Sequence, residues 1–214
     1  MELQKFVAEL KNETHQLYGV RFDLEEVLIG VRGISISDGT VSSNDDAFDR
    51  FNDILFNIYE DSFGYRIVTM DPGKVSPETL QKYGVIGGEA RTEPQLTRVR
   101  SGDHRGKPAI IQASQVLVRR DGNGDLIWDE KDKTYKGWFG VDIHAQGMEK
   151  DYVGVSSLAC TVTKATWKDR EWLDFYKAFL MAEAAAKAKN PKFQGIPYAI
   201  HNQDLALKIL GEVK

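Results

Sequence analysis

Two neighbouring stretches organise this chain: Gly137-Trp-Phe-Gly-Val-Asp-Ile-His-Ala-Gln-Gly147 and Val153-Gly-Val-Ser-Ser-Leu-Ala-Cys-Thr-Val-Thr163. The second holds the only cysteine, Cys160, and the first holds His144, sixteen positions earlier. Small residues crowd both positions. A thiol nucleophile needs a base within hydrogen-bond reach and a turn open enough for a substrate carbonyl to approach. The two stretches therefore predict a cysteine–histidine pair, carried on two or three short strands between Lys133 and Thr163.

The lone cysteine has two interpretations. A single cysteine in a cytosolic protein is commonly a buried small hydrophobe. The small neighbours Ser156, Ser157 and Ala159 instead suit an exposed turn. A thiol with a pKa of about 8.5 is mostly unreactive at neutral pH, so catalysis requires an imidazole that leaves a thiolate–imidazolium pair. His144 is the favoured partner, because the strand-like alternation around it points its side chain away from that of Ile143.

Composition excludes several classes of function. The chain has 214 residues and a net charge of −4, so it can bury a core and shows no nucleic-acid footprint. One cysteine allows no internal disulfide. The N-terminal stretch carries acids within its apolar run, so we expect no signal peptide, no membrane insertion and synthesis in a cytoplasm. We expect no organic cofactor, and the sequence makes no prediction about oligomeric state.

The order of predicted elements indicates an α+β fold with a mixed or antiparallel sheet. Apolar spacing predicts an N-terminal helix over 2–17, ended by Gly19, which is part of the fold, a lid or a linker to a partner. We assign residues 1–20 to this helix and 21–214 to a single catalytic-type domain. Further helices are predicted from Ser43, from Pro77, over 169–189 and over 202–213. Strands are predicted over 27–36, 53–59, 65–70, 95–100, 109–119 and 196–200.

The sequence around the pair resembles the catalytic domain of the L,D-transpeptidases. That family has a histidine in a turn, a gap of similar length, and then Ser-x-Gly-Cys. The resemblance covers Val141 to Val162 and implies the family's mixed sheet, a nucleophilic Cys160 and a basic His144. It implies that the carbonyl of Ala145 orients the imidazole and that the amides of Ala159 and Cys160 form the oxyanion hole.

Three positions depart from the family pattern: Ala159 replaces a glycine, Leu158 a histidine, and Val162 an arginine or asparagine. Substrate contacts made by those family residues do not carry over. We expect substrate contacts from residues that flank the pair and from a loop histidine, namely Ser157, Gly147, Thr161 and His104. A looser resemblance, to phage-encoded and bacterial peptidoglycan-cleaving lysins, involves the segments 30–33, 69–73, 106–109 and 119–125.

The loop after residue 120 has the spacing of a calcium site. Oxygen-bearing side chains fall at positions 1, 3, 5, 9 and 12 of a calcium-loop count, with a main-chain carbonyl at position 7: Asp121, Asn123, Asp125, Asp129, Asp132 and Ile127. Leu126 replaces the usual glycine, and the last ligand is not glutamate. The loop is therefore either a structural Ca²⁺ site or a polar hairpin tip.

These patterns support three functions. The favoured one is an endolysin-like cysteine hydrolase of peptidoglycan stem peptides that acts at the cell wall after release. The alternatives are an L,D-transpeptidase, which uses an amine acceptor in place of water, and a non-catalytic phage structural or wall-binding protein in which Cys160 is a buried remnant. A metal hydrolase is disfavoured, because the sequence shows no cluster of histidine and aspartate ligands.

Overall fold

A computed structural model describes residues 1–212 of the chain. Its main sheet is a closed barrel with the strand order β1-β13-β7-β8-β11-β12-β5-β4. The β1–β13 and β11–β12 pairs are parallel and the other six are antiparallel, which confirms the α+β class with a mixed sheet. The barrel strands are β1 (Val27–Val31), β4 (Asp53–Tyr59), β5 (Ser62–Thr69), β7 (Gln95–His104), β8 (Lys107–Gln112), β11 (Ile143–Gln146), β12 (Thr161–Thr166) and β13 (Ile196–His201).

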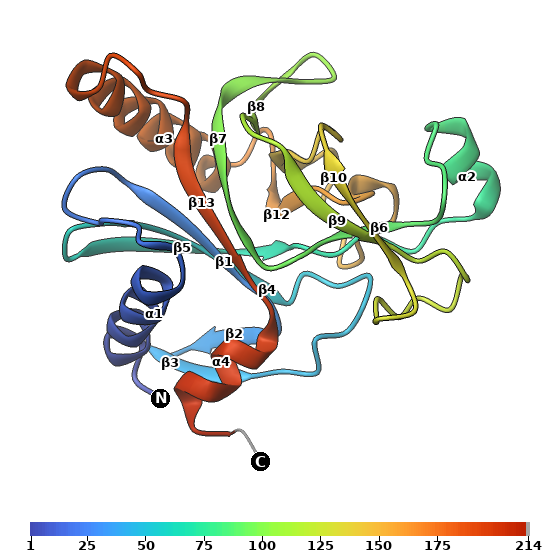
Figure 1. Cartoon of the computed structure of the whole chain (residues 1–214), viewed down its shortest axis with the longest axis horizontal. Coiled ribbons are helices and arrows are strands. Elements are labelled where there is room, and N and C mark those ends of the chain that lie inside the picture. The colour runs from blue at the N-terminus through green and yellow to red at the C-terminus, as the bar shows by residue number, and fades with distance from the viewer. Residues whose placement is uncertain (213–214) are drawn as a thin grey trace.

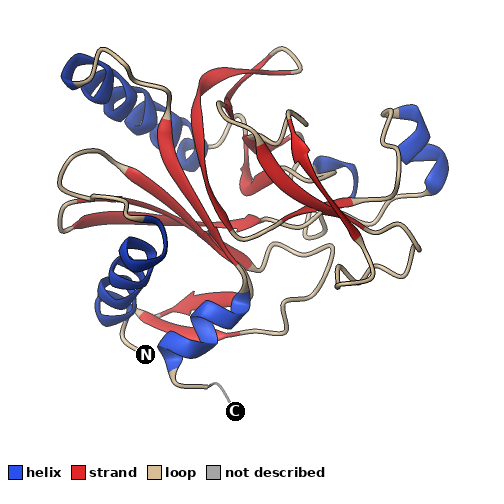
Figure 2. Ribbon diagram, viewed as in Figure 1, coloured by secondary structure: helices blue, strands red, loops and turns tan. Residues whose placement is uncertain are grey.

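Helices and two smaller sheets surround the barrel (Figure 1). The described helices are α1 (Leu3–Tyr18), α2 (Pro77–Lys82), α3 (Arg170–Lys189) and α4 (Gln203–Leu210), with a 3₁₀ turn, η1, at Gly154–Ser156. One small sheet has the order β10-β9-β6, and the other pairs β2 with β3. Their strands are β2 (Ile34–Ser37), β3 (Thr40–Ser43), β6 (Ala90–Thr92), β9 (Val116–Arg120) and β10 (Lys133–Gly137). Figure 2 shows α3 at one end of the long strands and α1 beside their outer side.

Side-chain alternation along the strands builds two cores. Leu28 and Leu55 belong to one buried cluster, to which α3 contributes Trp172 and Phe179. The residues next to those leucines, such as Ile29, lie in a second cluster with side chains from α1 and α4. Successive strand residues point to opposite faces, and both faces of these strands are covered. This explains why β1 is apolar throughout and β4 is apolar from Ile54 to Phe56.

The N-terminal helix is part of the fold. Phe6, Val7 and Leu10 of α1 are buried in the second cluster. Gly19 ends the helix in the left-handed conformation, with φ of 69°, as predicted. Over residues 1–212 no helix is both long enough and apolar enough to cross a membrane.

Most of the predicted elements are present, but some were predicted with the wrong extent or type. The strand predicted over 27–36 is two strands, β1 in the barrel and β2 in a small sheet, because the chain turns at Gly33, with φ of 66°. The strand predicted over 109–119 is two strands, because Ser114 accepts a hydrogen bond from the Arg98 amide and the chain then leaves the barrel for the small sheet. The short helix predicted after Ser43 is a loop, because the Asn44 side chain bonds the backbone at Asp46 and Asn52 and competes with helical bonds. The last helix was predicted to reach Val213, which lies outside the described residues, but it ends at Leu210, where Gly211 adopts the left-handed conformation with φ of 76°.

Candidate active site

Parallel pairing of β11 with β12 brings the predicted histidine and cysteine together. Ile143 pairs with Thr161, and the Thr161 amide donates a hydrogen bond to the Asp142 carbonyl at 2.9 Å. Cys160 directly precedes β12, so it lies beside the start of β11, where His144 is the second residue. A ring nitrogen of His144 lies within 4.8 Å of the Cys160 sulfur. The spacing seen in the sequence is therefore the length of the connection between two paired strands.

The His144 imidazole is fixed by one hydrogen bond and two aromatic neighbours. Its Nδ1 lies 2.8 Å from the carbonyl oxygen of Ala145, so Nδ1 donates a proton there and Nε2 keeps a lone pair. The ring stacks on His104, with 4.2 Å between centroids, and on Trp167, with 5.4 Å. The side chain is buried, and its Nε2 has no hydrogen-bond partner among the described residues. This tautomer is the one that a general base needs.

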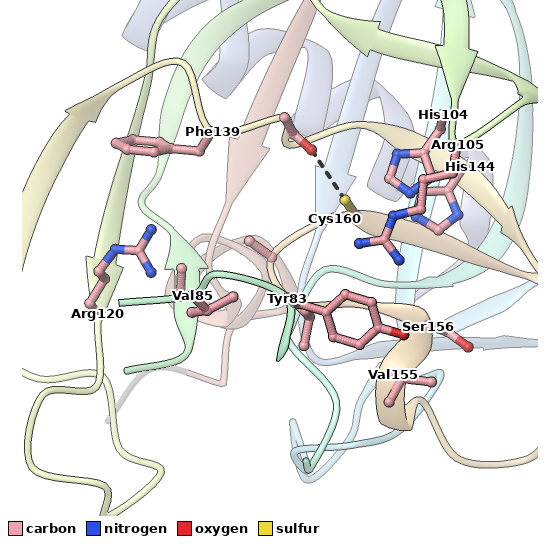
Figure 3. A pocket seen from close by; sticks show the side chains of 14 residues that line it. Tyr83, Val85, His104, Arg105, Arg120, Phe139, His144, Val155, Ser156 and Cys160 are labelled. Atoms are coloured by element: carbon pink, nitrogen blue, oxygen red, sulfur yellow. Dashed lines mark hydrogen bonds between the residues drawn. The ribbon is translucent and has the colours of Figure 1, made fainter. Parts of the chain in front are cut away.

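The Cys160 thiol lies beside a cavity of about 150 Å³. The residue is 9% exposed, and its sulfur donates a long hydrogen bond of 3.5 Å to the Gly140 carbonyl (Figure 3). Both imidazoles and the Arg105 guanidinium lie on one side of the sulfur. Within residues 1–212, neither the Ala159 amide nor the Cys160 amide donates a hydrogen bond, so both remain available to a developing oxyanion.

Burial favours the neutral forms of both reactive groups. It raises the pKa of the Cys160 thiol to about 12. Burial, and then the neighbouring His104, lowers the pKa of His144 to about 4. The resting thiolate–imidazolium pair expected from the sequence is therefore wrong for this structure, because a desolvated site penalises both charges. The geometry instead suits transfer of the thiol proton to His144 during attack on a substrate.

His104 lies in the site through the hairpin that joins β7 to β8. Its Nδ1 lies 2.9 Å from a carboxylate oxygen of Asp142, whose second oxygen accepts the Gln112 amide at 3.0 Å. His104 lines the cavity beside Cys160 and also the adjacent groove. This hairpin brings a second histidine to the His144–Cys160 pair, a convergence that the sequence did not predict.

A second, more open groove of about 390 Å³ adjoins the cavity. Gly147 lines it, as expected for a substrate contact, but Ser157 and Thr161 line neither space. The Ser157 hydroxyl donates to the Cys160 carbonyl, and that of Thr161 pairs with the Tyr198 hydroxyl. These two hydroxyls therefore support the cysteine turn and the barrel.

Tyr83, Arg105 and Trp167 are among the lining residues that had no predicted role from the sequence. The Arg105 guanidinium lies over the Tyr83 ring, 4.7 Å from its centroid. Arg105 and Gly106 have φ values of 53° and 80°, as in the tight turn of a two-residue hairpin. An Arg-Gly pair between two strand patterns was the available signal for the hairpin, whereas nothing local marked Tyr83 or Trp167.

The carboxylates of the predicted calcium loop bond to the loop's own backbone. Asp121 accepts hydrogen bonds from the amides of Gly124, Asp125 and Leu126. Asp132 accepts one from Gly122. In the part of the chain described, Asn123, Asp125, Ile127 and Asp129 occupy the hairpin between β9 and β10, and no three acidic side chains of this loop converge within 4.8 Å. Calcium binding stays a prediction.

Comparisons with known proteins leave the site to be interpreted from its own geometry. No family model, curated protein or solved structure matches the chain. A function is therefore inferred from the positions of His144, Ala145 and Cys160 and from the motif in the sequence.

Proposed function

We propose that this chain is a cysteine-dependent hydrolase of peptidoglycan stem peptides, with Cys160 as the nucleophile and His144 as the general base. One observation carries the chemistry: an imidazole whose Nδ1 is held by the Ala145 carbonyl has a ring nitrogen within 4.8 Å of a thiol beside a cavity. The substrate class comes from the resemblance of the His144–Cys160 segment to L,D-transpeptidases and from the looser resemblance to lysins.

Acylation follows from the neutral resting pair. The Cys160 sulfur attacks the peptide carbonyl carbon while the thiol proton passes to Nε2 of His144. The amides of Ala159 and Cys160 stabilise the oxyanion. His144 then gives its proton to the leaving amine, the C–N bond breaks, and a thioester remains on Cys160.

Deacylation separates the two related activities. Water attacks the thioester while His144 accepts a proton from it, and collapse of the intermediate releases a carboxylic acid and returns the proton to the Cys160 sulfur. An L,D-transpeptidase would use an acceptor amine in the same step and form a new peptide bond. Hydrolysis is the proposed outcome, in line with the resemblance to lysins.

The groove beside the cysteine favours an anionic peptide. Arg105, Lys107 and Lys150 line it together with Trp167 and Met148. Cationic side chains attract carboxylates, and an aromatic wall packs against the apolar parts of a peptide. Stem peptides carry free carboxylates beside small apolar residues, so they match this lining.

The test is digestion of purified peptidoglycan, with product masses measured for wild type, Cys160→Ala and His144→Gln. Wild type is expected to release stem-peptide fragments, and both variants to release none above background. The exposed variant His15→Gln is the matched histidine control and should digest like wild type. Thermal unfolding of each variant verifies folding. Identical digests from wild type and Cys160→Ala would remove the proposal.

One competing function has an observation in its favour. The thiol is buried, as expected for a non-catalytic wall-binding protein in which the cysteine is a remnant. Intact-mass analysis after incubation with a stem-peptide thioester separates the two functions. Acyl adducts on Cys160 that disappear in His144→Gln support the enzyme. Retention on peptidoglycan without adducts or products supports the binding protein.

A further inference from the structure

Two histidines and the cysteine converge in a way that catalysis alone does not require. His104, His144 and Cys160 each offer a ligand atom, and the three atoms lie within 4.8 Å of one another. Among the described residues this is the one group of three or more histidine, cysteine or acidic side chains that converges so closely. They arrive from the β7–β8 hairpin, from β11 and from the residue before β12 (Figure 3).

The Nδ1 nitrogen of each imidazole already has a hydrogen-bond partner. His104 Nδ1 lies 2.9 Å from the Asp142 carboxylate, and His144 Nδ1 lies 2.8 Å from the Ala145 carbonyl. Metal-binding histidines commonly donate this second N–H to a carboxylate or a backbone carbonyl, which leaves the other nitrogen for the metal. In this cluster His104 has the carboxylate partner and His144 has the carbonyl partner.

A buried lone pair points to a ligand. His144 is 3% exposed, and its Nε2 is fully buried without a hydrogen-bond partner in residues 1–212. Such atoms are normally satisfied by a protein group, a water or an ion. The only cysteine thiol lies within 4.8 Å of a ring nitrogen of His144, and the adjoining cavity of about 150 Å³ has room for a water, which occupies about 30 Å³.

We propose that His104, His144 and Cys160 bind one Zn²⁺, with water from the cavity as the fourth ligand. A set of two imidazoles and one thiolate suits zinc, whereas calcium and magnesium take oxygen ligands. Bonds of about 2.1 Å to nitrogen and about 2.3 Å to sulfur place tetrahedral ligands roughly 3.5 Å apart. Closing the present cluster onto the ion requires the ligand atoms to approach by about 1 Å and the His104 ring to turn out of its stack on His144, so that both lone pairs point at the metal.

Zinc binding would block Cys160 as a nucleophile. The metal replaces the thiol proton, which is released to solvent, so a sulfur–zinc bond forms as the S–H bond breaks. The lone pair of His144 is then taken as well, leaving neither nucleophile nor base. This consequence rests on the proposed function, whereas the binding itself does not.

Binding is tested by titrating the purified, chelator-treated protein with Zn²⁺ against a chromophoric chelator. One equivalent is expected to bind. Cys160→Ser and His104→Gln should each lower the affinity by at least about 100-fold, and Asp142→Asn by about 10- to 100-fold, since it removes the group that orients His104. His15→Gln should bind like wild type. Substitution of Co²⁺ should give a thiolate charge-transfer band that Cys160→Ser lacks.

Absence of stoichiometric binding, or equal affinity in all of these variants, would overturn the zinc site. Circular dichroism of each variant verifies that a lost affinity is not a lost fold. Digestion of peptidoglycan with added Zn²⁺, and again with excess chelator, separates the two proposals. Binding without digestion in either condition removes the enzyme and keeps the site. Digestion without binding removes the site and keeps the enzyme. Zinc-inhibited digestion restored by chelator supports both.

Discussion

The imidazole of His144 lies parallel to the indole of Trp167, with 5.4 Å between ring centroids and 1° between ring planes. The Trp167 Nε1 donates a hydrogen bond to the Pro108 carbonyl at 3.0 Å, which anchors the indole to β8. His144 therefore has its ring plane set by a residue just beyond β12, and its in-plane orientation set by the Ala145 carbonyl. A small error in the position of a catalytic base is costly to the rate.

Trp167→Leu is expected to lower kcat/KM for stem-peptide hydrolysis by about 10- to 100-fold, because the flat stacking surface is lost while the chain stays folded. Trp167→Phe restores a ring at that position and should recover most of the rate. The measurement is steady-state hydrolysis of a stem peptide. Trp138→Leu is the matched control, since Trp138 is 62% exposed and lines neither space. Equal losses in the leucine and phenylalanine variants would contradict the positioning role.

Ala159 has a φ of 155°, in a region that residues with a Cβ avoid, and it precedes the nucleophile. Ala159→Gly relieves strain of about 1–3 kcal/mol, loses about 0.8 kcal/mol of methyl burial and costs up to about 1 kcal/mol in chain entropy. The free energy of unfolding in urea should therefore change by less than about 1 kcal/mol.

Ala90→Gly is the control for that substitution. Ala90 is buried in the same small apolar cluster as Ala159, but its φ is negative. Its replacement should cost about 1–2 kcal/mol, because no strain is relieved. A larger loss at Ala159 than at Ala90 would show that the backbone there carries no strain.

Gly73 packs against the turn that leads to the nucleophile. Its amide donates to the Ser157 carbonyl at 2.9 Å, and a Cβ added to it would collide with the backbone of Gly154. Gly73→Ala should therefore cost about 1–3 kcal/mol in the free energy of unfolding, as overpacking does. Gly122→Ala is the control, because a Cβ there meets nothing closer than 4.0 Å. Equal free energies of unfolding for the two variants would contradict the close packing at Gly73.

The sequence predicts the local part of this site and misses its long-range part. The small residues around His144 and Cys160, the side-chain alternation and the distance between the two residues along the chain are local signals. The strands beside them, β11 and β12, are consecutive in the chain and pair in parallel. His104 was expected only as a substrate contact, and its convergence with the pair from forty residues earlier depends on a β8–β11 pairing that no periodicity encodes. Its Arg-Gly hairpin turn was visible, but its place in the barrel was not.

Barrel closure was unpredictable for the same reason. β1 and β13 pair in parallel, with Leu28 beside Tyr198, although most of the chain separates them. The α+β class follows from the order of elements, whereas the partner of each strand depends on which faces helices cover. The predicted thiolate–imidazolium pair was wrong for a different reason. Burial of Cys160 and His144 favours their neutral forms, and the local sequence pattern does not predict how deeply a single residue is buried.

His201 gives the fold a dependence on pH. It is 2% exposed, and its Nε2 pairs with the Thr14 hydroxyl at 3.0 Å. Burial lowers its pKa to about 4 in the folded chain, from 6.5. Between these values the unfolded chain binds the extra proton, so stability is full above about pH 6.5 and falls as the pH drops through 4. The loss from this residue is about 2–3 kcal/mol at about pH 4.5.

Urea unfolding at about pH 7, 5.5 and 4.5 checks this dependence. His201→Gln keeps a hydrogen-bonding side chain beside Thr14, and it should be less stable than wild type at about pH 7 but should lose less stability on acidification. The change of stability with pH should differ from that of wild type by the contribution of His201, and other buried groups keep theirs, since burial lowers the pKa of His144 to about 4 and raises that of Glu89 to about 7. His15→Gln, on the exposed side of α1, should keep the wild-type slope. An unchanged slope in His201→Gln would mean that His201 is protonated in the folded chain.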